Sequence, residues 1–434
     1  MFPEDTMLLI QNCRLVDPAS HTDGMRDILL SDGLVKTIAP AGTLPVPEGG
    51  TVIKACGAIA APGLVDTHSH FRDPGFPKKE DIHTGSLSAA KGGYTSIIMM
   101  ANTKPPIDSV PILSDVLARG EKEKIRIYSA ANVTVGMQGE ARTDFVSLKE
   151  AGAVVFTDDG RPITDASLLR SALKLARKLD MPVSLHEEDP AFVKEPGVNA
   201  GGKAAASLCL TGADRKAESS LVARDVKIAE EVGGKLLIQH ISSKEGVALV
   251  REAQKVNPLI QAEATPQHFS LTEDAVLQKG TLAKVNPPLR LEEDRQAILA
   301  GIADGTIRII ATDHAPHTRA EKSQSFPKAP SGMIGLETAL SLGLKNLVRP
   351  GVVSLEQFLA MLTVNPAAYY KLPAGKIYEG GPADLLLFDP DKEWTVTDSF
   401  ASRSSNSPFI GETLPGVVLY TICRGEIAYQ LGTN

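Results

Sequence analysis

His68 and His70 stand two residues apart in VDTHSHFRDPG, residues 65–75, at the end of an apolar run. Side chains two residues apart in a strand point to the same side, so the two imidazoles could chelate one metal ion. A pair of solvated or hydrogen-bonded histidines would explain an isolated His-X-His equally well. Arg72 continues the same period of two, and its guanidinium could hold a substrate carboxylate in a bidentate pair.

Single histidines close two other apolar segments. His186 ends PVSLH, and His240 ends LLIQH. Alone, each would more often be a buried structural residue than a metal ligand. Six of the nine histidines nevertheless lie at or near the ends of apolar segments: His68, His70, His186, His240, His268 and His317. The four imidazoles of the first three segments form a donor set that suits Zn²⁺ or a similar divalent ion.

Aspartates at the ends of two further segments could complete the coordination. They are Asp158 or Asp159 in FTDDG and Asp313 in IIATDHAPH. Four histidines and two carboxylates are too many ligands for one tetrahedral ion, so the set predicts two ions about 3.5–4 Å apart. Strand alternation lets only one of the adjacent aspartates face the site, and Asp-Asp-Gly would also suit a plain turn.

Two asparagines extend this set of polar residues. Asn102 ends IIMMANT and could share a bound anion with Arg72. Asn286 in KVNPPLR could contact a substrate, or it could be a simple loop residue before two prolines that fix the local backbone.

The elements that must position these residues alternate between strands and helices. Eight apolar or β-rich segments are separated by helix-sized stretches such as DASLLRSALKLARKL, and this alternation predicts a parallel sheet. The segments are 64–70, 94–103, 125–133, 153–159, 181–189, 235–242, 260–268 and 307–317. Eight such units favour an α/β fold with a closed (β/α)₈ TIM barrel, whose active sites lie at the carboxyl ends of the strands. The polar residues would then converge on one face.

The two ends of the chain show short β segments instead. Residues 1–61 contain LLIQNCRLVD and DILLSDGLVKTIAP, with Asp32-Gly33 as a hairpin turn. Residues 371–434 contain ADLLLFDP and GVVLYTICRGEIAYQ. We therefore expect 1–61 and 371–434 to form one small β-sandwich domain together, with the barrel at 62–370 between them.

Composition and charge are those of a globular protein that acts on small molecules. The 434 residues are 43% hydrophobic and 22% charged, and the net charge of −7 offers no basic surface for a nucleic acid. No window approaches about 18 apolar residues and the first residues lack a basic leader, so we expect a cytoplasmic protein without a membrane span. The four cysteines form no CxxC pair, which argues against a thiolate metal site and a disulfide framework.

Several stretches together carry a resemblance that spans nearly the whole chain. They are GLVDTHSHFRDPG, TGSLSAAKGGYTSIIMMANTKPPIDS, FTDDG, LHEED, QHIS, KVNPPLR, TDHAPH, GMIGLETAL, NPAA and GGPADLLLFDP. With them the chain resembles the metal-dependent amidohydrolases and, within these, the type I dihydroorotases. Arg72 together with NTKPP, DDG and NPPLR carries the narrower resemblance.

The resemblance implies a zinc enzyme that reversibly cyclises N-carbamoyl-L-aspartate to L-dihydroorotate and water in de novo pyrimidine biosynthesis. The implied metal ligands are His68 and His70 for a first ion, His186 and His240 for a second, Asp159 as the bridge, and Asp313. Asp313 would also be the general base and then the general acid for a metal-activated hydroxide. The metal would be Zn²⁺, with one or two ions per subunit, or another divalent ion. The resemblance also favours a homodimer and an association with another enzyme of the pathway.

The resemblance implies a second set of residues that hold the substrate. Arg72, Asn102 and His317 would bind its carboxylate. Asn286 and the backbone at Gly332, with Ser331, would contact the amide or ring atoms.

Two positions depart from the family pattern. Gln267 in TPQHF stands where histidine is common, and Ser331 in APSGMIG stands where phenylalanine is common, which leaves open how tightly the ring is held. A related hydantoinase or allantoinase is an alternative, although those relatives usually bridge their metals with a modified lysine that FTDDG lacks. An inactive barrel kept as an assembly scaffold is a second alternative, against which all six ligand candidates are present.

Overall fold

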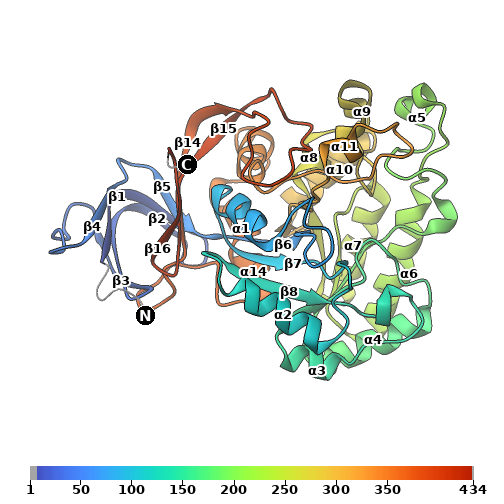
Figure 1. Ribbon diagram of the computed structural model, residues 1–434, viewed down its shortest axis with the longest axis horizontal. Coiled ribbons are helices and arrows are strands. Elements are labelled where there is room, and N and C mark those ends of the chain that lie inside the picture. Colours follow the sequence, from blue (N-terminus) through green and yellow to red (C-terminus); the bar gives the residue numbers. More distant parts are fainter. Residues whose placement is uncertain (1–6, 433–434) are drawn as a thin grey trace.

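The computed structural model describes residues 7–432 and contains a barrel of eight parallel strands, at the right of Figure 1. The strands are β6 (Leu64–Ser69), β7 (Tyr94–Met99), β8 (Arg126–Ala131), β9 (Ala153–Phe156), β10 (Val183–Leu185), β11 (Leu236–Ile238), β12 (Ile260–Ala264) and β13 (Ile309–Ile310). Each strand pairs with the next one along the chain. A bridge between Ser69 and His314 brings the first and last strands together, so the barrel is nearly closed. The predicted (β/α)₈ fold is confirmed.

All eight predicted strands are present, but they are shorter than the segments that predicted them. β13 has two residues, whereas its segment covered 307–317. The backbone leaves the extended form close to the polar residues, since His240 and Asp313 have φ values of 30° and 48° just beyond their strands. A strand cannot continue through positive φ values. His240 and Asp313 therefore lie on loops, and the short, buried strands that precede these loops hold them in place.

Helices cover the outside of the barrel. The longer ones are α1 (Ile82–Lys91), α2 (Val110–Gly120), α4 (Ala166–Lys178), α6 (Lys216–Val232), α7 (Lys244–Val256), α10 (Glu292–Ala303) and α13 (Leu355–Leu362). The shorter ones are α3 (Phe145–Glu150), α5 (Lys203–Leu208), α8 (Pro266–Ser270), α9 (Asp274–Lys279), α11 (Arg319–Lys322), α12 (Ala339–Gly343) and α14 (Val364–Tyr370). In α4 the side chains of Leu169, Ala172, Leu173 and Ala176 follow the helical period and are buried in one stripe, while Asp165 caps the first turn.

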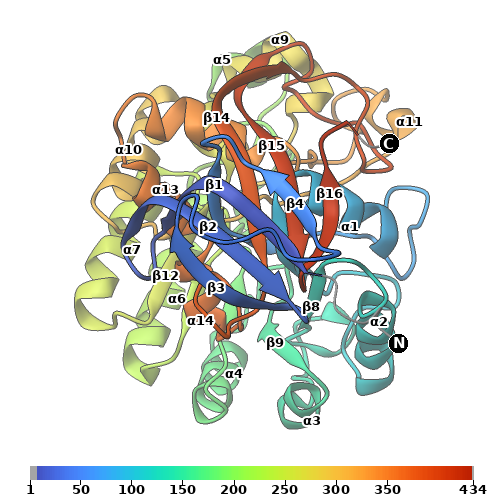
Figure 2. The same cartoon turned by 90° about the vertical axis from the view of Figure 1, so that its left-hand side faces the viewer.

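A second sheet contains strands from both ends of the chain (Figure 2). Its strands are β1 (Leu8–Asp17), β2 (Thr22–Ser31), β3 (Leu34–Pro40), β4 (Thr51–Lys54), β5 (Ile59–Pro62), β14 (Leu385–Thr395), β15 (Thr413–Cys423) and β16 (Glu426–Gln430). β5 pairs antiparallel with β14 and so joins the two ends. Side chains from both ends, among them Ile10, Ile28 and Leu385, form a separate apolar core. The prediction that the two ends build one β domain is confirmed.

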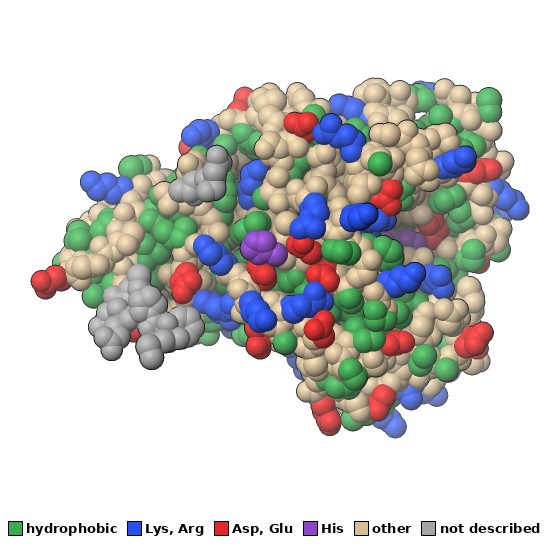
Figure 3. Space-filling view, in the orientation of Figure 1, with side chains coloured by type: hydrophobic (Ala, Val, Ile, Leu, Met, Phe, Trp, Pro, Cys, Tyr) green, Lys and Arg blue, Asp and Glu red, His purple; other side chains and the backbone are tan. Residues whose placement is uncertain are grey.

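The limits 1–61, 62–370 and 371–434 stay our proposal for the three parts, with β5 ending at Pro62 and α14 at Tyr370. None of the helices within residues 7–432 is long and apolar enough to cross a membrane. On the face drawn in Figure 3, Lys and Arg side chains lie next to Asp and Glu side chains rather than in one continuous basic field.

Candidate metal centre

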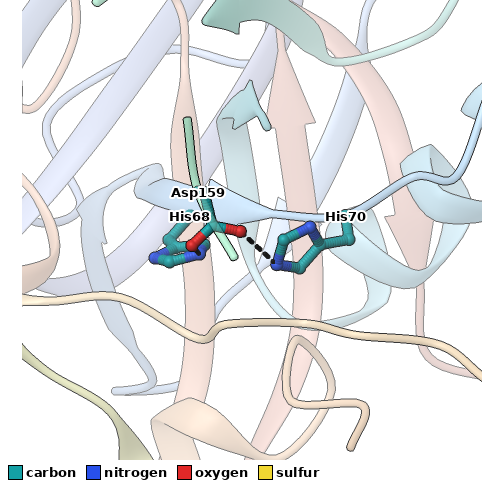
Figure 4. Close-up of side chains that lie close together, drawn as sticks. All are labelled: His68, His70 and Asp159. Atoms are coloured by element: carbon teal, nitrogen blue, oxygen red, sulfur yellow. Dashed lines mark ion pairs between the residues drawn. The ribbon is translucent and has the colours of Figure 1, made fainter. Parts of the chain in front are cut away.

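Asp159 lies among four histidines at one end of the barrel. Its Oδ1 atom is 3.4 Å from Nε2 of His68, and its Oδ2 atom is 3.4 Å from Nε2 of His70 (Figure 4). Oδ1 is also 3.7 Å from Nδ1 of His186 and 3.8 Å from Nε2 of His240. Two groups that could each hold a metal ion therefore share Asp159, one with His68 and His70 and one with His186 and His240.

Parallel strands position these residues. His68 lies in β6, and the other five ligand candidates lie in the loops that follow β6, β9, β10, β11 and β13: His70, Asp159, His186, His240 and Asp313. Since all strands of a parallel barrel point the same way, their carboxyl ends meet on one face. The structure brings all six residues together there.

The structure distinguishes the two adjacent aspartates of FTDDG. Asp158 turns away from the histidines, and its Oδ1 atom accepts hydrogen bonds from the backbone N–H groups of Val133 (2.9 Å) and Thr134 (3.2 Å). The Thr134 hydroxyl donates to the other oxygen of Asp158. Asp158 therefore ties the loop after β8 to the loop after β9, and Asp159 alone of the pair faces the histidines.

Hydrogen bonds on the far side of two imidazole rings orient them. Nδ1 of His68 is 2.6 Å from Oε1 of Glu263, and Nδ1 of His70 is 3.0 Å from Oδ1 of Asn102. Nε2 of His68 is buried and has no hydrogen-bond partner among the described residues. A divalent ion would satisfy that nitrogen, because a metal-bound histidine usually donates its other N–H to a carboxylate or carbonyl oxygen. The residues present therefore fit a metal ion.

The charges of the centre stabilise one another. Burial raises the pKa of Asp159, but the nearby charge of His68 and the close contacts with the His186, His240 and His68 rings outweigh it and hold the pKa well below its ordinary value. Burial likewise opposes ionisation of Asp313, whose pKa is still lowered, first by its hydrogen bond with His70. Oδ1 of Asp313 lies 3.1 Å from Nε2 of His70. Both carboxylates are thus available as anionic ligands.

A cavity of about 370 Å³ opens beside the centre. Its lining includes all five residues predicted to bind substrate: Arg72, Asn102, Asn286, His317 and Gly332. Arg72 has a φ of 58°, and its Nη2 atom is 3.5 Å from Nε2 of His317. The Oδ1 atom of Asn286 is buried without a hydrogen-bond partner in the described part of the chain. A guanidinium and an unpaired amide oxygen therefore line one small cavity with Asp159 and Asp313.

Asn102 contacts the metal-ligand candidates directly. Its Nδ2 atom donates to Oδ2 of Asp159 at 3.1 Å and to the Asp159 carbonyl oxygen at 3.3 Å, while its Oδ1 atom contacts His70. Asn102 thus links the two sides of the centre in this structure. Its predicted contact with the substrate carboxylate stays a prediction.

Both ring nitrogens of His317 have partners. Nε2 lies 2.8 Å from the Ser331 carbonyl oxygen, and because a carbonyl only accepts, Nε2 carries the proton. Nδ1 is 3.3 Å from Nζ of Lys79. Burial and the positive charges of Arg72, Lys79 and Lys322 lower the pKa of His317 far below its ordinary value, so the ring is neutral.

The peptide groups of Gly332 are also occupied. Its N–H donates to the carbonyl oxygen of Lys284 at 2.9 Å, and its own carbonyl accepts from Nζ of Lys322 at 2.9 Å. Gln267 and Ser331, the two departures from the family pattern, lie apart from the ligand set: Nε2 of Gln267 donates to the Thr312 carbonyl, and Ser331 contacts His317.

Three charged residues of the centre were not recognised from the sequence. Glu263 lies within the buried strand β12 and contacts His68, and Glu188 lies 3.4 Å from Nε2 of His186. Lys79 contacts His317. An acid inside a fully buried strand is costly unless it is paired, and this signal in IQAEA could have indicated Glu263.

His268 lies near a strand end, as predicted, but it is not one of the residues that could hold a metal. Its Nδ1 atom is 2.7 Å from the Thr265 hydroxyl, and its Nε2 atom donates to the Pro287 carbonyl at 2.9 Å. Burial lowers its pKa to about 4. His268 is therefore a neutral, hydrogen-bonded residue of the protein interior.

The chain belongs to the cyclic amidohydrolases, and a solved member of that class shares its fold. The solved structure of L-hydantoinase (dihydropyrimidinase) from Arthrobacter aurescens superposes with a TM-score of 0.87 at 27% identity, over 98% of this chain and 96% of that chain.

Sequence comparisons narrow the class to one family. A family model described as Dihydro-orotase-like matches residues 57–246. A curated protein named dihydroorotase from Clostridium acetobutylicum is 49% identical over 425 residues, covering 98% of this chain and 100% of the relative. One from Lactococcus lactis is 49% identical over 423 residues, covering 98% and 99%. The chain belongs to the dihydroorotase family.

Proposed function

We propose that the chain catalyses the reversible cyclisation of N-carbamoyl-L-aspartate to L-dihydroorotate and water, a step of de novo pyrimidine biosynthesis. The observation that carries the proposal is the position of Asp159 within 3.4–3.8 Å of four histidine nitrogens, beside a cavity that Arg72 lines. The 49% identity to curated dihydroorotases over nearly the whole chain supports the choice of substrate.

The proposed metal is Zn²⁺, with one or two ions per subunit. His68 and His70 would hold one ion, His186 and His240 the other, with Asp159 between them. When bound, such ions lower the pKa of water and polarise a carbonyl group. Imidazole and carboxylate ligands also accept other divalent ions, so elemental analysis of the purified protein should identify the metal.

Asp313 is the proposed proton carrier. In the hydrolytic direction it accepts a proton from the attacking water and then donates it to the ring nitrogen that leaves as the amide bond breaks. Ring closure uses the same steps in reverse, with loss of one water. The position of Asp313 supports this role, because it lines the cavity and its Oδ1 atom is 3.1 Å from Nε2 of His70.

The substrate carboxylate is the proposed partner of Arg72, with Asn102 and His317. A guanidinium can bind a carboxylate through two parallel hydrogen bonds, which fixes both position and orientation. Asn286 and the backbone at Gly332 would contact the amide or ring atoms. The unpaired, buried Oδ1 atom of Asn286 supports this, since it could accept a ring N–H.

A spectrophotometric assay tests the substrate. The purified, metal-loaded protein should open L-dihydroorotate and should have little activity on hydantoin or allantoin at the same concentration. The likeness to L-hydantoinase favours a hydantoinase as the second candidate. Turnover of a neutral hydantoin with none of dihydroorotate would contradict our proposal. Protein that binds no divalent ion and turns over none of the three would instead favour an inactive scaffold.

A homodimer in the cytoplasm is the proposed working form, without nucleic-acid or membrane partners, and an association with another pyrimidine-pathway enzyme is part of the same proposal. Light scattering of the purified protein should give twice the chain mass of 46.0 kDa. A single chain mass at micromolar concentration would contradict the dimer.

A further inference from the structure

Two buried lysines, Lys284 and Lys322, donate hydrogen bonds from their ammonium groups to backbone carbonyl groups, and Nζ of Lys284 also lies 5.0 Å from the centre of the Phe326 ring. Nζ of Lys284 donates to the carbonyl oxygens of Phe326 (2.7 Å), Ala329 (2.8 Å) and Pro327 (3.4 Å). Lys284 is 1% exposed and Lys322 is 4% exposed. No carboxylate within residues 7–432 forms an ion pair with either of them.

The second lysine holds the same stretch of chain. Nζ of Lys322 donates to the carbonyl oxygens of Gly332 (2.9 Å), Pro330 (3.0 Å) and Lys284 (3.5 Å). Five of the six carbonyls around the two lysines therefore come from residues 326–332, which we call the wall segment. Its sequence is FPKAPSG, and it contains no helix or strand.

Burial of an ammonium group without a carboxylate costs stability. The low pKa of Lys322, about 7, reflects this cost: burial lowers it first, the charge of Lys284 lowers it further, and the charge of Glu321 offsets only part of both. Simple packing does not explain two such residues, because an apolar side chain would fill the space without the cost. Five of their six donated hydrogen bonds instead fix the path of the wall segment, which has no hydrogen bonds of a helix or sheet.

The wall segment reaches the cavity. Ser331 and Gly332 line it, and the Ser331 carbonyl holds the protonated Nε2 of His317 at 2.8 Å. The two residues on either side of Ser331, Pro330 and Gly332, are the ones whose carbonyls Lys322 binds. The ammonium group of Lys322 therefore holds the backbone on both sides of the Ser331 carbonyl, which in turn orients the His317 ring. The Asn406 amide also donates to the Gly332 carbonyl, at 3.1 Å.

We propose that Lys284 and Lys322 are positioning residues for substrate binding, which hold the wall segment so that His317 and Gly332 face the substrate. The role rests on the proposed function, since the cavity is taken to hold the substrate carboxylate. Neither lysine touches the metal-ligand candidates. Their loss should weaken substrate binding more than it slows the chemical step.

The experiment compares Lys322→Met and Lys284→Met with Lys328→Met in the metal-loaded protein. Methionine keeps the apolar stem and removes the ammonium group, and Lys328 is an exposed lysine within the wall segment itself. Three quantities are measured: KM and kcat with dihydroorotate, metal content, and hydrogen exchange of the peptide that contains 326–332. Lys322→Gln, which keeps an N–H donor, is included in case Lys322→Met does not fold.

We expect Lys322→Met and Lys284→Met to raise KM about tenfold or more, the scale of one lost charge-assisted hydrogen bond, with kcat changed less than about threefold. Exchange of 326–332 should become faster, metal content should stay constant, and Lys322→Gln should lie between wild type and Lys322→Met. Lys328→Met should match wild type in all three quantities.

Unchanged exchange of the wall segment in both methionine variants would overturn the proposal, and so would a fall in kcat or metal content at constant KM. The exchange measurement needs no substrate. If wild type fails to act on dihydroorotate, the proposed function fails, while faster exchange in the variants still supports the anchoring of the wall segment.

Discussion

Nδ1 of His68 lies 2.6 Å from Oε1 of Glu263, although 195 residues separate them in the sequence. This contact fixes the ring so that Nε2 faces Asp159. Glu263→Gln should therefore lower metal affinity about 10–100-fold, the usual effect of losing a carboxylate behind a metal-bound histidine. A chelator competition measures the affinity, and Glu252→Gln on the surface of α7 is the matched control. Wild-type affinity in Glu263→Gln would contradict a role for this contact.

The two adjacent aspartates should fail in different ways. Asp159→Asn should lose metal and activity together, because Asp159 is the residue shared by both histidine pairs. Asp158→Asn should keep its metal and lose stability by about 1–3 kcal/mol, because it weakens buried hydrogen bonds to the loop after β8. Elemental analysis and chemical denaturation measure the two effects. Equal metal loss in both variants would contradict the assignment of the bridge to Asp159.

Asp313→Ala should reduce kcat by at least about 100-fold, the lower end of the effect of removing a general acid–base group. The four histidines and Asp159 remain, so most of the metal should be retained. Steady-state kinetics on protein of measured metal content checks both statements. If turnover stays within about threefold of wild type, another group carries the proton.

Arg72→Ala should act mainly on substrate binding. Loss of a charged hydrogen-bond partner is worth about 1.5–3 kcal/mol, so KM for dihydroorotate should rise about 10–100-fold while kcat falls less. Arg349→Ala, at an exposed arginine paired with Glu393, is the control. An effect on kcat alone would assign Arg72 to the chemical step instead.

His268 should make the protein less stable in mild acid. Its folded pKa is about 4 against an ordinary value of 6.5, so between these values the unfolded chain binds the proton and the folded chain does not. The contribution of His268 to the free energy of unfolding is fully present above pH 6.5. It is lost as the pH falls toward 4, by about 3 kcal/mol in total. Urea denaturation of wild type and His268→Asn at several pH values measures the difference. The exposed His83→Asn should keep the wild-type pH dependence.

The sequence was most informative where polar residues end apolar runs. His186 or His240 alone could have been a buried structural residue, but six histidines at or near strand ends were consistent with one face of a barrel. The barrel itself was predicted from the alternation of strands and helices. The lengths of the strands could not be predicted, because His240 and Asp313 adopt positive φ values that no residue pattern indicates.

Contacts between distant residues explain the rest. Which of Asp158 and Asp159 faces the histidines depends on Thr134, whose hydroxyl donates to Asp158 from another loop. The alternation of side chains along a strand does not reveal this contact. Glu263 resembled an ordinary strand residue until its contact with His68 was visible. Lys284 and Lys322 donate to backbone carbonyls. Because every residue has a backbone carbonyl, the sequence gives no indication of these contacts.

The meeting of β6 and β13 has a consequence for assembly of the enzyme. His70 and Asp313 are 243 residues apart in the chain, yet they face each other across this junction. An ion coordinated by both residues would link the first and last strands of the barrel. It would thereby close a loop of more than half the polypeptide. Before β13 has joined the barrel, Asp313 is not in place and the set of metal ligands is incomplete. We therefore expect metal binding to require the completed barrel, and release of the ion should coincide with opening of the barrel.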